Sequence, residues 1–217
     1  MGDWDERAAR AEARFLDGQA RLPDGGDERQ RQLTRMGNAA WAAGLSLLMA
    51  GRIAESSKWL LRSAETYRRS WEDAPPGSWG RPIGAMKSRL IAADREGVAE
   101  DARWALEAGA AGSASPIGIY AAALAQLVLG QDGAPGELAR GLRERDDLPR
   151  SVADALAALA SGDAGGYESA IRALLADFES REEYLEDTPV ADTVLAFQAL
   201  ARERGLDVAL GSPLLPA

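Results

Sequence analysis

The chain has 217 residues, of which 46% are hydrophobic, so it is long enough to bury the core of one large or two small domains. It contains no cysteine and no histidine, which excludes disulfides, thiolate and imidazole metal sites, and catalysis by a Ser-His-Asp triad. Its net charge of −9 at pH 7 repels phosphate groups at long range, so neither nucleic acid nor an anionic membrane is an expected partner.

The composition also bears on where the protein is expected, which is the cytoplasm. A chain without cysteine suits a reducing compartment, and the acidic residues 1–7 do not resemble the apolar core of a secretory signal. The longest apolar run, 117–129, is shorter than the roughly 18 to 20 residues needed to cross a bilayer.

Residues 1–71 are predicted to form the first two helical units. Apolar residues recur there at helical spacing, and the predicted helices are 3–21, 27–51 and 53–71. Turns rich in Gly and Pro, at 23–26 and 50–52, separate these helices. The second and third helices are therefore expected to pack as a hairpin.

A connection rich in Trp, Pro and Gly is predicted over residues 72–82. The stretch Trp71–Ile83 contains two of the six tryptophans and three of the ten prolines, and this composition does not continue a helix. Long ordered loops on rigid scaffolds often carry binding residues, so this is the first place to look for a site.

Residues 83–205 are predicted to form repeated helical hairpins, followed by a capping tail at 206–217. The positions that open helices are Ile83, Ile117, Val152 and Val190. They are 34, 35 and 38 residues apart, and periods of this size are typical of stacked helical hairpins. The triplets Pro-Ile-Gly and Val-Ala-Asp each occur twice at these positions, which fits internal duplication and equally fits shared helix-start chemistry.

The sequence as a whole predicts a single all-α domain, 1–217, of about ten helices in antiparallel pairs, because no alternating strand pattern occurs. Within it, Gly44, Gly51 and the run 45–64 resemble a tetratricopeptide (TPR) repeat, although Ser56 and Ser63 stand where that consensus has Ala. The resemblance implies hairpins stacked as a TPR-like right-handed α-solenoid or a compact helical bundle, with a concave face that binds proteins.

The predicted function is that of a non-enzymatic interaction protein, which binds a protein or peptide through the concave face and the Trp71–Ile83 loop. The candidate partner-binding residues are Trp79, Arg81, Tyr120, Glu72 and Asp73. Arg81 lies at a helix N-terminus, where free N–H groups favour an anionic or carbonyl group. Trp71 is expected to point inward, and Trp79 to face a cleft whose rim also includes Arg81 and Tyr120. The alternative is that the loop simply plugs a groove between two hairpins.

Two other functions stay open. The run 179–187 contains Glu-x-x-Glu twice, and on a helix each pair would share a face and could hold Mg²⁺ or Mn²⁺. The candidate ligands are Glu179, Glu182, Glu183 and Glu186. With a bound metal they would form the site of a carboxylate-dependent hydrolase that acts on a phosphorylated small molecule. The other interpretation of this run is a solvated acidic helix face, which binds no metal. The interaction protein predicted above needs no cofactor. The second alternative is a structural homodimer.

Overall fold

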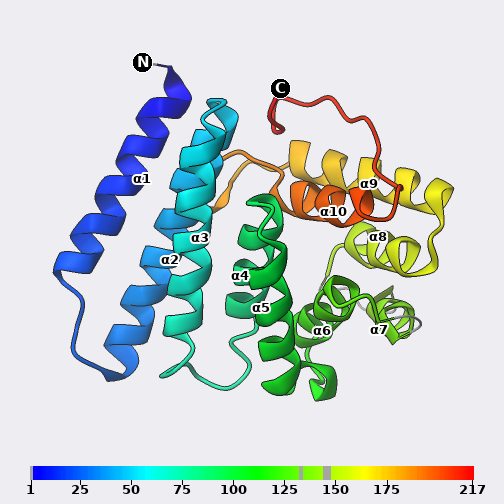
Figure 1. Ribbon diagram of the computed structural model, residues 1–217, viewed down its shortest axis with the longest axis horizontal. Coiled ribbons are helices and arrows are strands. Elements are labelled where there is room, and N and C mark those ends of the chain that lie inside the picture. Colours follow the sequence, from blue (N-terminus) through cyan, green and yellow to red (C-terminus); the bar gives the residue numbers. More distant parts are fainter. Residues whose placement is uncertain (1, 132–133, 144–147) are drawn as a thin grey trace.

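The computed structural model describes residues 2–131, 134–143 and 148–217, and within them every regular element is helical (Figure 1). The α-helices are α1 (Asp3–Ala20), α2 (Gly26–Met49), α3 (Ile53–Ser70), α4 (Gly80–Ile91), α5 (Arg95–Glu107), α6 (Pro116–Val128), α7 (Ala134–Arg143), α8 (Arg150–Ser161), α9 (Ala164–Glu179) and α10 (Asp192–Arg202), with 3-10 turns η1 (Ala110–Gly112) and η2 (Leu185–Asp187). The predicted all-α class is confirmed.

Three of the helices begin at a side-chain cap that is followed three residues later by glycine. Asp94, Ser115 and Asp163 accept hydrogen bonds from the backbone N–H groups of Gly97, Gly118 and Gly166 at 3.0, 3.1 and 3.0 Å. These bonds satisfy N–H groups that have no partner inside the helix. They fix the starts of α5, α6 and α9, and with them the lengths of the hairpins.

The helices pack mainly against their neighbours in the chain. The helices α1, α2 and α3 lie side by side, and α4–α5, α6–α7 and α8–α9 follow as successive antiparallel pairs (Figure 1). The last helix departs from this order, because α10 contacts α4 as well as α9. One cluster of buried side chains extends from Trp79 to Leu214, while smaller clusters lie beneath α1–α3.

The segment between α9 and α10 makes an excursion to the N-terminal helices. After α9 it runs toward α2, where η2 packs, and then enters α10 (Figure 1). Glu186 in η2 pairs with Arg14 of α1 at 3.0 Å. The tail at 206–217 then returns to the start of α10, where the Ala191 amide donates a hydrogen bond to the Leu214 carbonyl at 3.0 Å. The segment that leads into α10 and the start of α10 itself are thus tied to other parts of the chain.

The hairpin that resembles a tetratricopeptide repeat is closely packed. A Cβ atom at Gly44 of α2 would lie 2.7 Å from the Leu60 side chain of α3, so only glycine allows this approach. Ser56 and Ser63, which stand where the consensus has Ala, donate hydrogen bonds to the carbonyls of Gly44 and Gly37 at 2.7 and 3.0 Å. These two serines therefore join α3 to α2.

The ring of Tyr67 on α3 lies between two glycines of neighbouring helices. A Cβ atom at Gly37 of α2 would lie 2.9 Å from one edge of the ring, and one at Gly84 of α4 would lie 2.8 Å from the opposite edge. Both helices therefore approach α3 at a spacing that leaves no room for a methyl group. Because α2 and α4 both pack closely against Tyr67, side chains near these two glycines line one pocket.

None of the helices in the described part of the chain is both long enough and apolar enough to span a bilayer.

Candidate functional site

A pocket of about 390 Å³ opens where α2, α3, α4 and the start of α10 meet. The lining side chains that carry polar groups include Thr34, Asn38, Tyr67, Arg81, Lys87 and Asp192, and we call it the Arg81 pocket. Its volume lies within the range of small-molecule and side-chain binding sites. It contains Arg81, a residue predicted from the sequence to bind a partner.

One wall of the Arg81 pocket comes from α2. Thr34, Asn38 and Trp41 line it at spacings of four and three residues, which places them on one helix face. The Tyr67 hydroxyl donates to Asn38 Oδ1 at 2.7 Å. Burial raises the pKa of Tyr67 far above its ordinary value, and the charges of nearby Asp192 and Glu186 act in the same direction. Tyr67 is therefore a hydrogen-bond donor at neutral pH and not a base.

The opposite wall presents Arg81 from the first turn of α4. This residue is only 8% exposed. Its Nε and Nη2 donate to Thr34 Oγ1 at 3.3 and 3.2 Å, and Nη2 also donates to Gln30 Oε1. Both partners are neutral, and no carboxylate of the described residues lies within ion-pair distance. Burial lowers the pKa of Arg81, with no carboxylate opposing the effect. The protein thus holds a positive charge in a confined site without neutralising it.

Lys87, one turn and a half further along α4, has a different environment. Its ammonium group forms an ion pair with Asp192 and donates to Thr193 Oγ1 at 2.9 Å. Both members of the pair are largely buried, and Asp192 is the first residue of α10. The charge of Lys87 is therefore balanced within the pocket, whereas that of Arg81 is not.

The structure places the two tryptophans of the connection in packing positions. Trp79 is 7% exposed, and its ring centroid lies 5.4 Å from that of Trp71. Trp71 in turn meets Trp104 of α5 edge-on at 5.6 Å. The prediction that Trp79 faces a cleft is wrong, because Trp79 is the N-cap residue directly before α4, with helical φ and ψ, and it belongs to the buried core.

The other predicted partner-binding residues lie apart from the Arg81 pocket. Tyr120 is buried in α6, with its ring 6.5 Å from that of Phe197. Glu72 and Asp73 are exposed on the connection and do not line the pocket. The predicted cleft formed by Trp79, Arg81 and Tyr120 is therefore wrong, and of the five candidates the pocket contains Arg81 alone. Whether the others contact a partner stays a prediction.

Tyr120 allows a direct test of whether its hydroxyl has a structural role. Among the described residues no partner satisfies this buried hydroxyl, and an unsatisfied polar group costs stability. We expect Tyr120→Phe to raise the free energy of unfolding by about 1 kcal/mol in urea denaturation.

Tyr167→Phe is the matched control, because the buried Tyr167 hydroxyl donates to Gln198 Oε1 at 2.9 Å. Losing that bond should lower the free energy of unfolding by about 1 kcal/mol. If Tyr120→Phe destabilised the protein as much as this control, the Tyr120 hydroxyl would have a partner in solution.

The acidic run does not form the predicted helix. The helix α9 ends at Glu179, and Glu186 lies in η2 with a φ of 55°. The chain therefore turns away between them, so the Glu-x-x-Glu pairs do not share a helix face. Glu179 accepts a hydrogen bond from Ser212 at 2.7 Å, while Glu182 and Glu183 are exposed. Within the described residues no group of three acidic side chains is placed to hold a metal ion.

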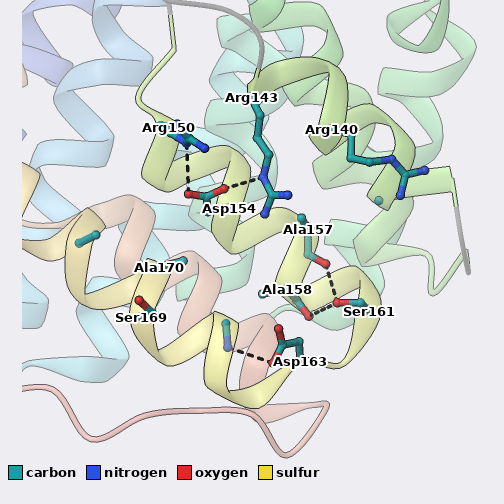
Figure 2. Close-up of a pocket in the computed structure, with 13 residues that line it drawn as sticks. Arg140, Arg143, Arg150, Asp154, Ala157, Ala158, Ser161, Asp163, Ser169 and Ala170 are labelled. Carbon is teal, nitrogen blue, oxygen red and sulfur yellow. Dashed lines mark hydrogen bonds and ion pairs between the residues drawn. The ribbon is translucent and has the colours of Figure 1, made fainter.

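A second, larger pocket of about 610 Å³ lies between α7, α8 and α9. Figure 2 shows Arg143 and Arg150 converging on Asp154 of α8, with Nε-to-carboxylate distances of 2.5 and 3.9 Å, while Arg140 points away from them. All three arginines are exposed. Exposed ion pairs of this kind contribute little binding energy, so this pocket is the weaker candidate.

Sequence reasoning missed most of the Arg81 pocket, although signals for it exist. Thr34 and Asn38 stand beside the apolar stripe of α2 and continue to Trp41 at helical spacing. Lys87 is one of only two lysines in the chain and follows Arg81 by six residues. The link to Asp192 had no local signal, because it joins residues that are 105 positions apart.

No protein-family model, curated protein or solved structure matches this chain.

Proposed function

We propose that the protein is a non-enzymatic interaction protein and that the Arg81 pocket receives a group from a protein or peptide partner. The observation that carries the proposal is the buried guanidinium of Arg81, which has neutral hydrogen-bond partners and no carboxylate of the described residues within ion-pair distance. A buried charge left in this state costs folding free energy. A buried charged group that lowers stability is typical of a functional site, where a bound ligand can supply the missing interaction.

The chemistry of the pocket favours binding over catalysis. The chain has no histidine or cysteine, and the pKa of Tyr67 is raised. Asp192 is engaged by Lys87, so no group in the pocket is poised as a general base at neutral pH. A TPR-like arrangement, in which α2, α3 and α4 contribute to one concave face, would place this pocket in the path of a bound peptide. A cytoplasmic location is part of the same proposal.

The test compares three forms of the protein against a synthetic random peptide library in solution. They are the wild type, Arg81→Gln and the control Arg103→Gln, which removes an exposed arginine of α5. Peptides that are retained by the wild type and the control, and identified by mass spectrometry, are expected to be lost with Arg81→Gln. The affinity should fall by roughly 10-fold or more, as for loss of a hydrogen bond to a charged group.

Two outcomes would overturn the proposal. One is that the folded wild type retains no peptide at all, and the other is that all three forms retain the same set with equal affinity. Light scattering on the same samples reports the mass in solution and separates peptide binding from the alternative of a structural homodimer. Circular dichroism on each variant shows whether its helices are intact.

A further inference from the structure

We infer that the group bound by the Arg81 pocket is a single carboxylate and not a phosphate, an inference that rests on the proposed function and narrows it to one ligand chemistry. Two features of the pocket point to it. The first is the set of free hydrogen-bond donors on its walls, and the second is the balance of charge inside it.

Two residues that line the pocket carry hydrogen-bond donors left over from the contacts described above. Nε and Nη2 of Arg81 are used by Thr34 and Gln30, while Nη1 has no acceptor among the described residues. Asn38, which also lines the pocket, uses Oδ1 to accept from the Tyr67 hydroxyl, and its Nδ2 amide remains as a donor. A carboxylate has two oxygens in one plane, so it can accept one hydrogen bond from a guanidinium and another from an amide.

The charge inside the pocket matches a monoanion. Arg81 contributes one positive charge, and the pair of Lys87 and Asp192 contributes none. Glu186, whose charge acts on nearby Tyr67, is paired with Arg14. A phosphate monoester carries a charge of about −1.5 to −2 at pH 7, so a second free cation would be needed to balance it. The net charge of −9 on the whole chain further disfavours a dianion.

A carboxylate can come from the C-terminus of a peptide or from an Asp or Glu side chain. Both sources present the same planar group, and the walls described above do not select between them. The experiment therefore uses small probes that separate the two sources and compares them with inorganic phosphate.

The test is a titration of the ¹⁵N-labelled full chain, followed through the Gly84 amide and the Arg81 side-chain Nε–H. The probes are N-acetylglycine for a terminal carboxylate, the α-amide of N-acetylglutamate for a side-chain carboxylate, neutral N-acetylglycinamide and inorganic phosphate. At least one carboxylate is expected to give saturable shifts. The neutral amide should give none, and phosphate should bind at least about 10-fold more weakly than the better carboxylate.

Two variants test the assignment of the residues. Arg81→Gln should weaken carboxylate binding by about 10- to 100-fold. Asn38→Asp has the same shape as the native side chain and keeps an acceptor for the Tyr67 hydroxyl, but it adds a negative charge to the lining of the pocket. It should abolish binding while leaving the helical content unchanged. Arg103→Gln, at an exposed position of α5, should bind like the wild type.

The possible failures are distinguishable. Phosphate binding as tightly as either carboxylate, or carboxylate binding that survives both Arg81→Gln and Asn38→Asp, would overturn the carboxylate assignment. The assignment would also be overturned if library peptides bound equally well after their C-terminal and side-chain carboxyl groups were converted to amides. That result would leave the proposed interaction function intact. If N-acetylglycine bound in the pocket but no peptide did, the carboxylate site would stand and the interaction function would fall.

Discussion

Replacing Asp101 by alanine is expected to lower the free energy of unfolding by about 3–5 kcal/mol, as when one member of a buried ion pair is removed. Asp101 on α5 is fully buried. Its carboxylate accepts hydrogen bonds from Arg89 Nε of α4 at 2.7 Å and from Arg68 Nη1 of α3 at 3.0 Å. One carboxylate thus joins three helices, and its loss leaves the largely buried Arg89 with Asp94 as its remaining partner.

Chemical denaturation followed by circular dichroism measures this effect, and Asp154→Ala is the control. Asp154 pairs with Arg143 at 2.5 Å, but both side chains are at least one-third exposed, at 34% and 40%. Its removal should cost at most about 1 kcal/mol. Asp101→Asn, which keeps one acceptor oxygen, should fall between the two. Equal losses for Asp101→Ala and Asp154→Ala would mean that water reaches Arg89 freely once Asp101 is gone.

The Asp101 network also leads to the two tryptophans of the Trp71–Ile83 connection, which are packed although Glu72 and Asp73 between them are exposed. The Arg68 guanidinium lies 5.3 Å from the centre of the Trp104 ring, and Trp104 packs edge-on against Trp71. Trp71 contacts Trp79 at the start of α4. The tryptophans that made this stretch look like a binding loop therefore continue the core, and what faces the pocket is Arg81. The packing-plug alternative describes the aromatic residues of the connection better.

Much of the fold was predictable because the signals for helix ends are local. Gly51 has a φ of 75° and ends the α2 region, and Gly130 with a φ of 64° follows α6, both conformations that glycine adopts without strain. Pro116 begins α6 as predicted. The return of α10 to α4 was not predictable in this way, since it depends on contacts between residues about a hundred positions apart and on a chain crossing without a repeat signal.

The same distinction applies to the candidate site. Arg81 was found because a basic residue at a helix start has a local meaning, but its partners Gln30 and Thr34 lie 51 and 47 residues earlier. The acidic run is not a metal site because of where its helix ends, which the spacing of the glutamates does not reveal. Helical spacing of glutamates has meaning only while the helix continues, and α9 ends at Glu179, the first of them.

The second large effect concerns α10, the last helix of the chain. If α10 packed only against its neighbour in the chain, as the other helices mainly do, its loss would leave the rest of the fold intact. Phe197 of α10 is fully buried and packs edge-on against Tyr120 of α6. We expect Phe197→Ala to lower the free energy of unfolding by about 3–5 kcal/mol, which is the usual cost of removing a buried aromatic ring. Chemical denaturation measures the loss, and Leu185→Ala, which truncates an exposed side chain, should change it by less than about 0.5 kcal/mol.

The two possible roles of α10 give different unfolding curves for Phe197→Ala. If α10 is integral to the core, the variant unfolds in one transition at lower denaturant concentration. If α10 were an independent terminal helix, it would detach alone, and most of the helical signal would remain with its original midpoint. Detachment would also remove Asp192 from Lys87 and leave the pocket with two free cations. Phosphate should then compete with carboxylate, because in the wild type the negative charge of Asp192 neutralises Lys87 and leaves a single free cation in the pocket.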